Sequence, residues 1–298
     1  DYFPADRRSM AMTIFALGAP IGAWLGSDLA GYVSNLHGWR AAFLVLGVPG
    51  VILAIIMMVT IKEPTRGRLD AVVDDKAPSV METVRFLWSQ KAAVHAMIGA
   101  GLSAFWGWGL MWFTPLFLQR TYGMDEGAAG ALLGEIYLVG GIGASLVTAY
   151  VVARPSFTDP RKISNLLAVV TAAATIPSFL AYWTYDLGVA KLMWWIFIPA
   201  IYFYIGPAMA LCQNLAAPKM RGMAIAISLI IANLLNLIVA PAIVGGLSDY
   251  FAGSQPAGAE SLRLAQLILA PSGLWAAWHY WRASKYIIED QKRAVGYV

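Results

Sequence analysis

The chain has 298 residues, of which 59% are hydrophobic and only 13% are charged, against about 25% charged residues in soluble domains. Together with a mean hydropathy of +0.63, this composition excludes an ordinary water-soluble protein and favours one that exposes apolar side chains to lipid. The net charge of +4 does not indicate a nucleic-acid partner, because the basic residues lie in short loops and form no contiguous patch.

The chain offers few residues for metal, disulfide or cofactor chemistry. Cys212 is its single cysteine, and His37, His95 and His279 are far apart in the sequence, in no ligand spacing. No metal centre and no cofactor is therefore expected. The sequence also contains no phosphate-binding Gly-x-x-x-x-Gly-Lys loop and no dinucleotide fingerprint, so transport driven by ATP on this chain is not expected.

Eight apolar segments are long enough to cross a membrane, which takes about 20 residues in a helix. Because a helix satisfies its own backbone hydrogen bonds in lipid, the sequence predicts an all-α polytopic membrane protein with eight transmembrane helices. The segments cover approximately residues 10–34, 40–61, 93–118, 127–152, 163–184, 191–213, 223–247 and 262–283.

The basic residues predict the topology of these spans. If the N-terminus is cytoplasmic, 17 of the 21 lysines and arginines fall on the cytoplasmic side, and this is the asymmetry that the positive-inside rule expects. Both termini are then cytoplasmic, and a bacterial inner membrane is the expected location. The outer side receives only Arg40, Arg120, Lys191 and Arg263.

A short repeat divides the chain. Arg8-Ser9-Met10-Ala11 opens the first span and Arg221-Gly222-Met223-Ala224 opens the seventh, each shortly after a proline. Six spans separate the two starts, so both copies cross the membrane in the same direction. Parallel repeats of six helices are typical of transporters built from two halves.

Several motifs, in this order and spacing, resemble the major facilitator superfamily, and its spinster-like members in particular. The first half contributes the glycine run Gly18-x-Pro20-x-Gly22-x-x-x-Gly26, then Gly38-Trp39-Arg40 and Glu63-Pro64-x-Arg66-Gly67; the second contributes Trp112-x-x-Pro115, Pro218-x-x-Arg221 and Gly245-Gly246-Leu247-Ser248-Asp249. The resemblance covers nearly the whole chain.

The resemblance implies a partial major facilitator fold, consisting of spans five to twelve of twelve. Residues 1–61 would be the last two helices of the N-terminal bundle, 62–91 a cytoplasmic linker loop, 92–284 the complete C-terminal six-helix bundle, and 285–298 a cytoplasmic tail. The chain begins with Asp1 rather than methionine, so four spans are expected upstream of it.

Carboxylates inside lipid are costly and mark candidate coupling sites. Glu135 lies about eight residues into the fourth span, roughly 12 Å deep at 1.5 Å per residue, and is a candidate for coupling to a proton or ion. Asp28, late in the first span, is a second candidate. The structural alternative is a Glu135 that is hydrogen-bonded to a neighbouring helix and an Asp28 that reaches the outer interface.

Candidates for the substrate cavity are amide and aromatic side chains within the spans. Asn233 and Asn236 share one helix face at i, i+3 spacing, and either substrate binding or helix association explains them. Trp106 and Trp112 belong to an aromatic third span, for which helix packing through interleaved glycines is the alternative to a cavity wall. Tyr202 is a further candidate hydroxyl.

Two further groups of residues are candidates for conformational change. Pro115, Pro199 and the pair Gly206 and Pro207 lie within apolar segments and are candidate hinges, because proline interrupts the helical hydrogen-bond ladder. The resemblance implies gating roles for Arg8 and Arg221 at the two repeat starts, and for the loop that holds Arg154, Asp159 and Arg161. That loop lacks the glycine-rich Asp-Arg pattern of the family, which puts its gating role in doubt.

These features predict a secondary active or facilitative transporter that works by alternating access, not an enzyme. The expected substrate is a small organic or amphipathic solute, with H⁺ or Na⁺ as the coupling ion and a monomer as the working unit. One alternative is an organic-anion/cation symporter of the same superfamily, although the basic side chains lie only at span ends. A membrane-embedded enzyme or a non-transporting eight-span protein is the other alternative, but no cluster of catalytic side chains occurs at membrane depth.

Overall fold

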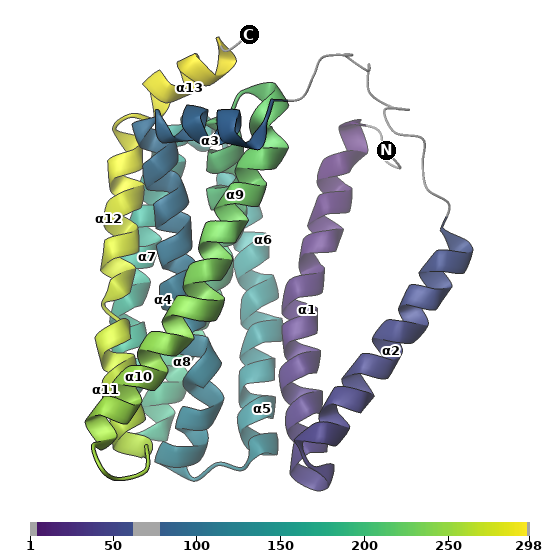
Figure 1. Cartoon of the computed structure of the whole chain (residues 1–298), viewed down its shortest axis with the longest axis vertical. Coiled ribbons are helices and arrows are strands. Elements are labelled where there is room, and N and C mark those ends of the chain that lie inside the picture. The colour runs from purple at the N-terminus through teal and green to yellow at the C-terminus, as the bar shows by residue number, and fades with distance from the viewer. Residues whose placement is uncertain (1–4, 62–77, 297–298) are drawn as a thin grey trace. The chain divides into compact units, whose positions relative to one another are not determined.

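The structure is a computed structural model that describes residues 5–61 and 78–296, with side chains from residue 18 onward. Regular structure in these ranges is entirely helical (Figure 1). Six helical runs are long and apolar enough to span a membrane, and they begin at Trp39, Lys91, Glu126, Pro160, Leu187 and Pro218. The chain is an integral membrane protein.

The helices form two units. Unit 1 comprises residues 1–76 and 124–142, and contains α1 (Ala5–His37), α2 (Trp39–Thr60), α5 (Glu126–Glu135) and the π-helix η1 (Ile136–Gly140). Gly38, with φ of 80°, joins α1 to α2; this left-handed backbone is readily adopted only by glycine. The most apolar 18-residue stretch of α2 has a mean hydropathy of 2.8, and 6% of it is buried.

Unit 2 comprises residues 77–123 and 143–298. Its first helices are α3 (Val80–Trp88), α4 (Lys91–Tyr122), α6 (Gly141–Val152), the 3₁₀ turn η2 (Pro155–Phe157), α7 (Pro160–Trp183) and α8 (Leu187–Asn214). The 3₁₀ turn η3 (Pro218–Met220), α9 (Arg221–Asn233), the π-helix η4 (Leu234–Val239), α10 (Ala240–Ala252), α11 (Ala259–Leu269), α12 (Ser272–Ser284) and α13 (Ile287–Val295) follow.

α4 is the central helix of unit 2. It packs against α8, α9, η4, α11 and α12. Of its most apolar 18-residue stretch, 78% is buried. Glycines make this packing close: a Cβ atom placed on Gly107 would lie 3.0 Å from the side chain of Ile201 on α8. Small residues at such contacts let helix backbones approach each other in lipid.

Helices are present at each of the eight predicted spans. The first prediction falls within α1 and the last falls on α11 and α12, which are separated by Ala270 and Pro271. Pro271 has no N–H to continue the ladder of α11, so each of these two helices is shorter than a single span. The fourth and seventh predicted spans each contain a π-helix in their middle, η1 and η4.

The linker and the tail contain helices that the sequence analysis did not expect. The predicted loop 62–91 lies partly outside the described residues, but its later part forms α3. A capping box of Ser79 and Glu82 stabilises the start of this helix. The predicted tail 285–298 contains α13. Both helices lie at the same end of unit 2 (Figure 1).

Candidate functional site

α1 and α5 pack so closely that side chains are excluded from the contact. A Cβ atom placed on Gly31 would lie 2.6 Å from the carbonyl oxygen of Glu126, and one placed on Gly130 would collide with the carbonyl oxygen of Ser27. α1 was assigned by sequence to the N-terminal bundle and α5 to the C-terminal bundle. The contact therefore joins segments from the two predicted bundles.

Polar side chains fasten one end of this contact. The hydroxyl of Ser34 on α1 donates a hydrogen bond to the carboxylate of Glu126, and the amide of Asn35 lies 3.5 Å from the carboxylate of Asp125. Asp125 also caps α5, since its Oδ1 accepts a hydrogen bond of 2.8 Å from the N–H of Ala128. The end of α1 and the start of α5 are thereby held together.

The two candidate coupling carboxylates lie farther along this contact. A Cβ atom placed on Gly134 would lie 3.2 Å from the Cβ of Asp28, so α1 places half-buried Asp28 directly against α5. Glu135, the next residue, is exposed and makes no hydrogen bond or ion pair with the described residues. It lies roughly 14 Å along α5 from Glu126 at 1.5 Å per residue.

A π-helix begins immediately after Glu135. The segment η1 runs from Ile136 to Gly140, and a second π-helix, η4, begins immediately after Asn233 and contains Asn236. Short π-helical segments within α-helices occur frequently at functional sites. Three of the polar residues selected from the sequence therefore lie at the two places where helical hydrogen bonding departs from the α pattern.

The structure brings together two of the predicted cavity residues in unit 2. The indole Nε1 of Trp112 on α4 donates a hydrogen bond of 2.7 Å to Oδ1 of Asn236. Asn236 is buried, whereas Asn233 is exposed. Asn236 thus joins η4 to α4 through an interhelical hydrogen bond, which is one of the alternatives left open by the sequence.

Trp106 and Tyr202 lie in different surroundings. Trp106 is fully buried and donates a hydrogen bond of 3.0 Å to the hydroxyl of Ser178, so it is a core residue with no surface available to a solute. Tyr202 is also buried, with Trp108 edge-on at 5.7 Å between ring centroids. Its hydroxyl has no hydrogen-bond partner within the described ranges, and a buried unsatisfied hydroxyl is destabilising unless water or a ligand reaches it.

The predicted gating loop forms its own local contacts. Asp159 accepts hydrogen bonds from the backbone and the guanidinium of Arg161, with an ion pair of 2.8 Å, and these hydrogen bonds hold the pKa of its carboxyl below the usual range. Arg154 donates to the hydroxyl of Tyr150 at 2.9 Å. Arg221 is exposed at the start of α9, and the side chain of Arg8 lies outside the described residues.

The candidate hinges lie inside regular helices. Pro115 is within α4, and Pro199, Gly206 and Pro207 are within α8. Both helices run through these positions without a π or 3₁₀ segment. Within the spans, the π-helical departures from α-helical bonding lie instead at η1 and η4. η4 ends two residues before Pro241, which has no N–H to donate to the helical ladder.

One pairing was missed from the sequence. His95 on α4 and His279 on α12, 184 residues apart, lie side by side with 2.9 Å between their Nδ1 atoms. Trp278 packs edge-on against both rings. Two histidines do not make a metal centre, and no group of three or more metal-ligating side chains gathers in the described part of the chain.

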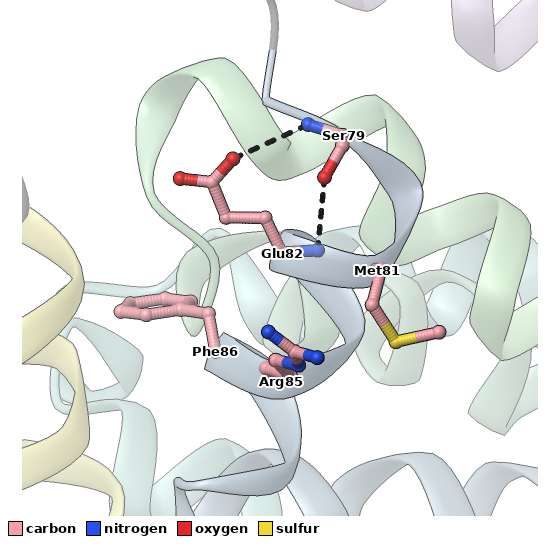
Figure 2. A pocket seen from close by; sticks show the side chains of 5 residues that line it. All are labelled: Ser79, Met81, Glu82, Arg85 and Phe86. Carbon is pink, nitrogen blue, oxygen red and sulfur yellow. Dashed lines mark hydrogen bonds between the residues drawn. The ribbon is translucent and has the colours of Figure 1, made fainter.

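A surface hollow is lined by other residues. Figure 2 shows the residues that line it, which all belong to α3 or to its N-cap: Ser79, Met81, Glu82, Arg85 and Phe86. The Ser79 hydroxyl and the Glu82 carboxylate are occupied in the capping box that begins α3. The hollow contains none of the candidate transport residues.

Comparison with known proteins identifies the family. The sequence profile described as Major Facilitator Superfamily matches residues 1–241. The chain therefore belongs to the major facilitator superfamily, whose members are transporters rather than enzymes.

Within the superfamily the chain is similar to an MFS-type efflux pump of Mycolicibacterium smegmatis, with 28% identity over 97% of this chain and 67% of the pump. It is also similar to protein spinster homolog 1 of Xenopus laevis, with 22% identity over 99% of this chain and 60% of that protein. The chain thus spans about two thirds of the pump and less of the frog protein.

A solved structure has the same fold. A bacterial homolog of the human lysosomal transporter spinster, in an inward-facing and unoccupied conformation, superposes with a TM-score of 0.75 at 23% identity. The match covers 97% of this chain and 73% of that one. The spinster-like resemblance seen in the sequence motifs is confirmed.

Proposed function

We propose that this protein is a secondary transporter that moves a small organic solute by alternating access. The observation that carries the proposal is the α1–α5 contact, which joins the two predicted bundles and is fastened at one end by Ser34, Asn35, Asp125 and Glu126. Alternating access requires a contact between bundles that closes one end of a central path and later opens. The two bundles proposed are those predicted from the sequence, residues 1–61 and 92–284.

The basic residues support an orientation for this contact. With both termini in the cytoplasm, the fastened end of α1 and α5 is on the outer side of the membrane, and the starts of α4 and α9 are on the cytoplasmic side. A bacterial inner membrane is the proposed location.

Glu135 is the proposed coupling residue. Its carboxylate is unpartnered within the described residues, lies deep in a span, and precedes η1. A carboxyl group that protonates on one side of the membrane and releases its proton on the other couples solute movement to the proton gradient. Asp28, on the facing helix, is placed to share this role.

The substrate proposed is a small amphipathic molecule. The spinster-like resemblance of the sequence implies such a solute, and the efflux pump and spinster relatives match nearly the whole chain. A sugar acid is the second candidate, because a galacturonate transporter of Dickeya chrysanthemi is 29% identical over 42% of this chain. The first candidate has the wider match.

Uptake into proteoliposomes tests the proposal and its coupling. With an imposed pH gradient, the protein should accumulate a lysophospholipid or a lipophilic dye in preference to galacturonate. The Glu135→Gln variant should lose at least tenfold of the gradient-driven accumulation but keep solute exchange at equal pH. A Glu289→Gln variant, at an exposed position on α13, is the matched control and should transport normally. If Glu135→Gln accumulates the solute undiminished at every pH, Glu135 does not couple transport to the proton gradient.

A further inference from the structure

A cluster of three cations lies where α4 begins and α12 ends. Lys91, Arg282 and Lys285 surround two aromatic rings: Lys91 Nζ and the Arg282 guanidinium lie 5.3 Å and 5.6 Å from the ring centroid of Tyr286. Lys285 Nζ lies 3.6 Å from the ring of Trp281. Figure 1 shows α13 following directly on this end of α12.

The three cations have no acidic partner among the described residues. The two nearby carboxylates on α13 are otherwise engaged, since Glu289 pairs with Arg293 at 3.2 Å and Asp290 accepts a hydrogen bond of 2.6 Å from the N–H of Ala92. The Nε of Arg282 is buried without any hydrogen-bond partner in this part of the structure. Another guanidinium nitrogen of this half-buried side chain donates a hydrogen bond of 3.1 Å to the hydroxyl of Tyr286, so the charge of Arg282 is balanced by no carboxylate in this part of the structure.

The surroundings of the cluster are those of a membrane interface. Trp278 and Trp281 on α12 are each 46% exposed, and tryptophan is enriched at the level of the lipid headgroups. The same helix also exposes the apolar side chains of Leu274 and Trp275, which are suited to contact with lipid tails. A ligand that reaches the cations from the bilayer is therefore an amphipathic anion.

We propose that Lys91, Arg282 and Lys285 bind the phosphate of an anionic phospholipid of the surrounding bilayer. The terminal guanidinium nitrogens of Arg282 carry N–H groups that donate charge-assisted hydrogen bonds to a phosphate, while the two lysines act as point charges. Basic pockets between transmembrane helices on the cytoplasmic side are typical sites for acidic headgroups. The bound lipid holds together the start of α4, the end of α12 and α13.

Lipid titration by native mass spectrometry tests this site. The delipidated protein should bind phosphatidylglycerol in preference to phosphatidylcholine, and Arg282→Gln with Lys285→Gln should weaken phosphatidylglycerol binding by at least tenfold, since each cation contributes about fivefold. The matched control is Lys162→Gln with Arg221→Gln, which removes the same charge at exposed positions on α7 and α9. It should bind the lipid as the unchanged protein does.

A single variant and a competition with inorganic phosphate complete the test. Lys285→Gln alone changes an exposed side chain and preserves the fold, so its expected loss of about fivefold stands even if the double variant unfolds. Inorganic phosphate added in excess should not displace the lipid. Equal binding by the site and control variants, no preference for phosphatidylglycerol, or displacement by phosphate alone would each overturn the proposal.

Discussion

At the scale of the residue, Asn236 shows how a polar group is accommodated inside the membrane. Its side chain is buried in η4 and its Oδ1 accepts the indole N–H of Trp112 at 2.7 Å. Interhelical hydrogen bonds of this kind contribute about 0.6 kcal/mol on average in membrane proteins. The bond therefore orients η4 against α4 more than it stabilises the bundle.

A double-mutant cycle checks this contribution. Trp112→Phe and Asn236→Leu should each lower the unfolding free energy, and their coupling energy should be about 0.6 kcal/mol. The measurement is reversible unfolding in mixed micelles, followed by the circular dichroism of the helices. A coupling energy of zero would mean that the hydrogen bond is not formed in the folded protein.

Residue-level roles were only partly predictable from the sequence. Glu135, Asn233 and Asn236 stood out because polar side chains are rare in apolar spans; in the structure Glu135 and Asn233 directly precede π-helices and Asn236 lies within one. The pairing of His95 with His279 could not be foreseen, because 184 residues separate them and each looks isolated in its own helix. Trp106 was selected as an aromatic wall, but its environment in the core depends on Ser178 of another helix.

At the scale of the element, the α1–α5 contact depends on the absence of side chains. Gly31→Ala would place a Cβ 2.6 Å from the carbonyl oxygen of Glu126, and relieving such overpacking typically costs about 1–3 kcal/mol. The melting temperature and the transport rate should both fall. Gly26→Ala on the same helix is the control, because a Cβ there would have no described atom within 4 Å.

The outcome separates packing from helix propensity. Alanine favours a helix over glycine by about 1 kcal/mol, so Gly26→Ala should be neutral or slightly stabilising. A melting temperature for Gly31→Ala that matches that of Gly26→Ala would show that α1 and α5 do not touch in the folded protein.

The long elements were predictable and the short ones were not. Every predicted span coincides with helix because an apolar run of about 20 residues has few other options in lipid. α3 and α13 have nine residues each, too short and too amphipathic to register as spans. The π-helix η1 gave no signal, because a hydropathy pattern does not show which carbonyl oxygen each backbone N–H binds.

At the scale of the whole molecule, the account rests on movement between two bundles. The sequence repeat and the family both predict two halves, and α1 with α5 supplies a contact that crosses between the predicted halves. That contact is tight at the glycines but fastened by exposed polar side chains at its end. Exposed polar contacts of this kind contribute little free energy. Such a weak contact can open in each transport cycle.

A reversible disulfide across the α1–α5 contact is the most direct test. A Cβ on Gly127 would lie 3.9 Å from the Cβ of Asn35, within the range of about 3.5–4.5 Å that a disulfide requires. Asn35→Cys with Gly127→Cys, made in a Cys212→Ala background that removes the single native cysteine, should stop uptake into proteoliposomes on oxidation and regain it after reduction, while either cysteine alone has no effect. Full uptake by the oxidised, quantitatively cross-linked protein would contradict alternating access through the α1–α5 contact.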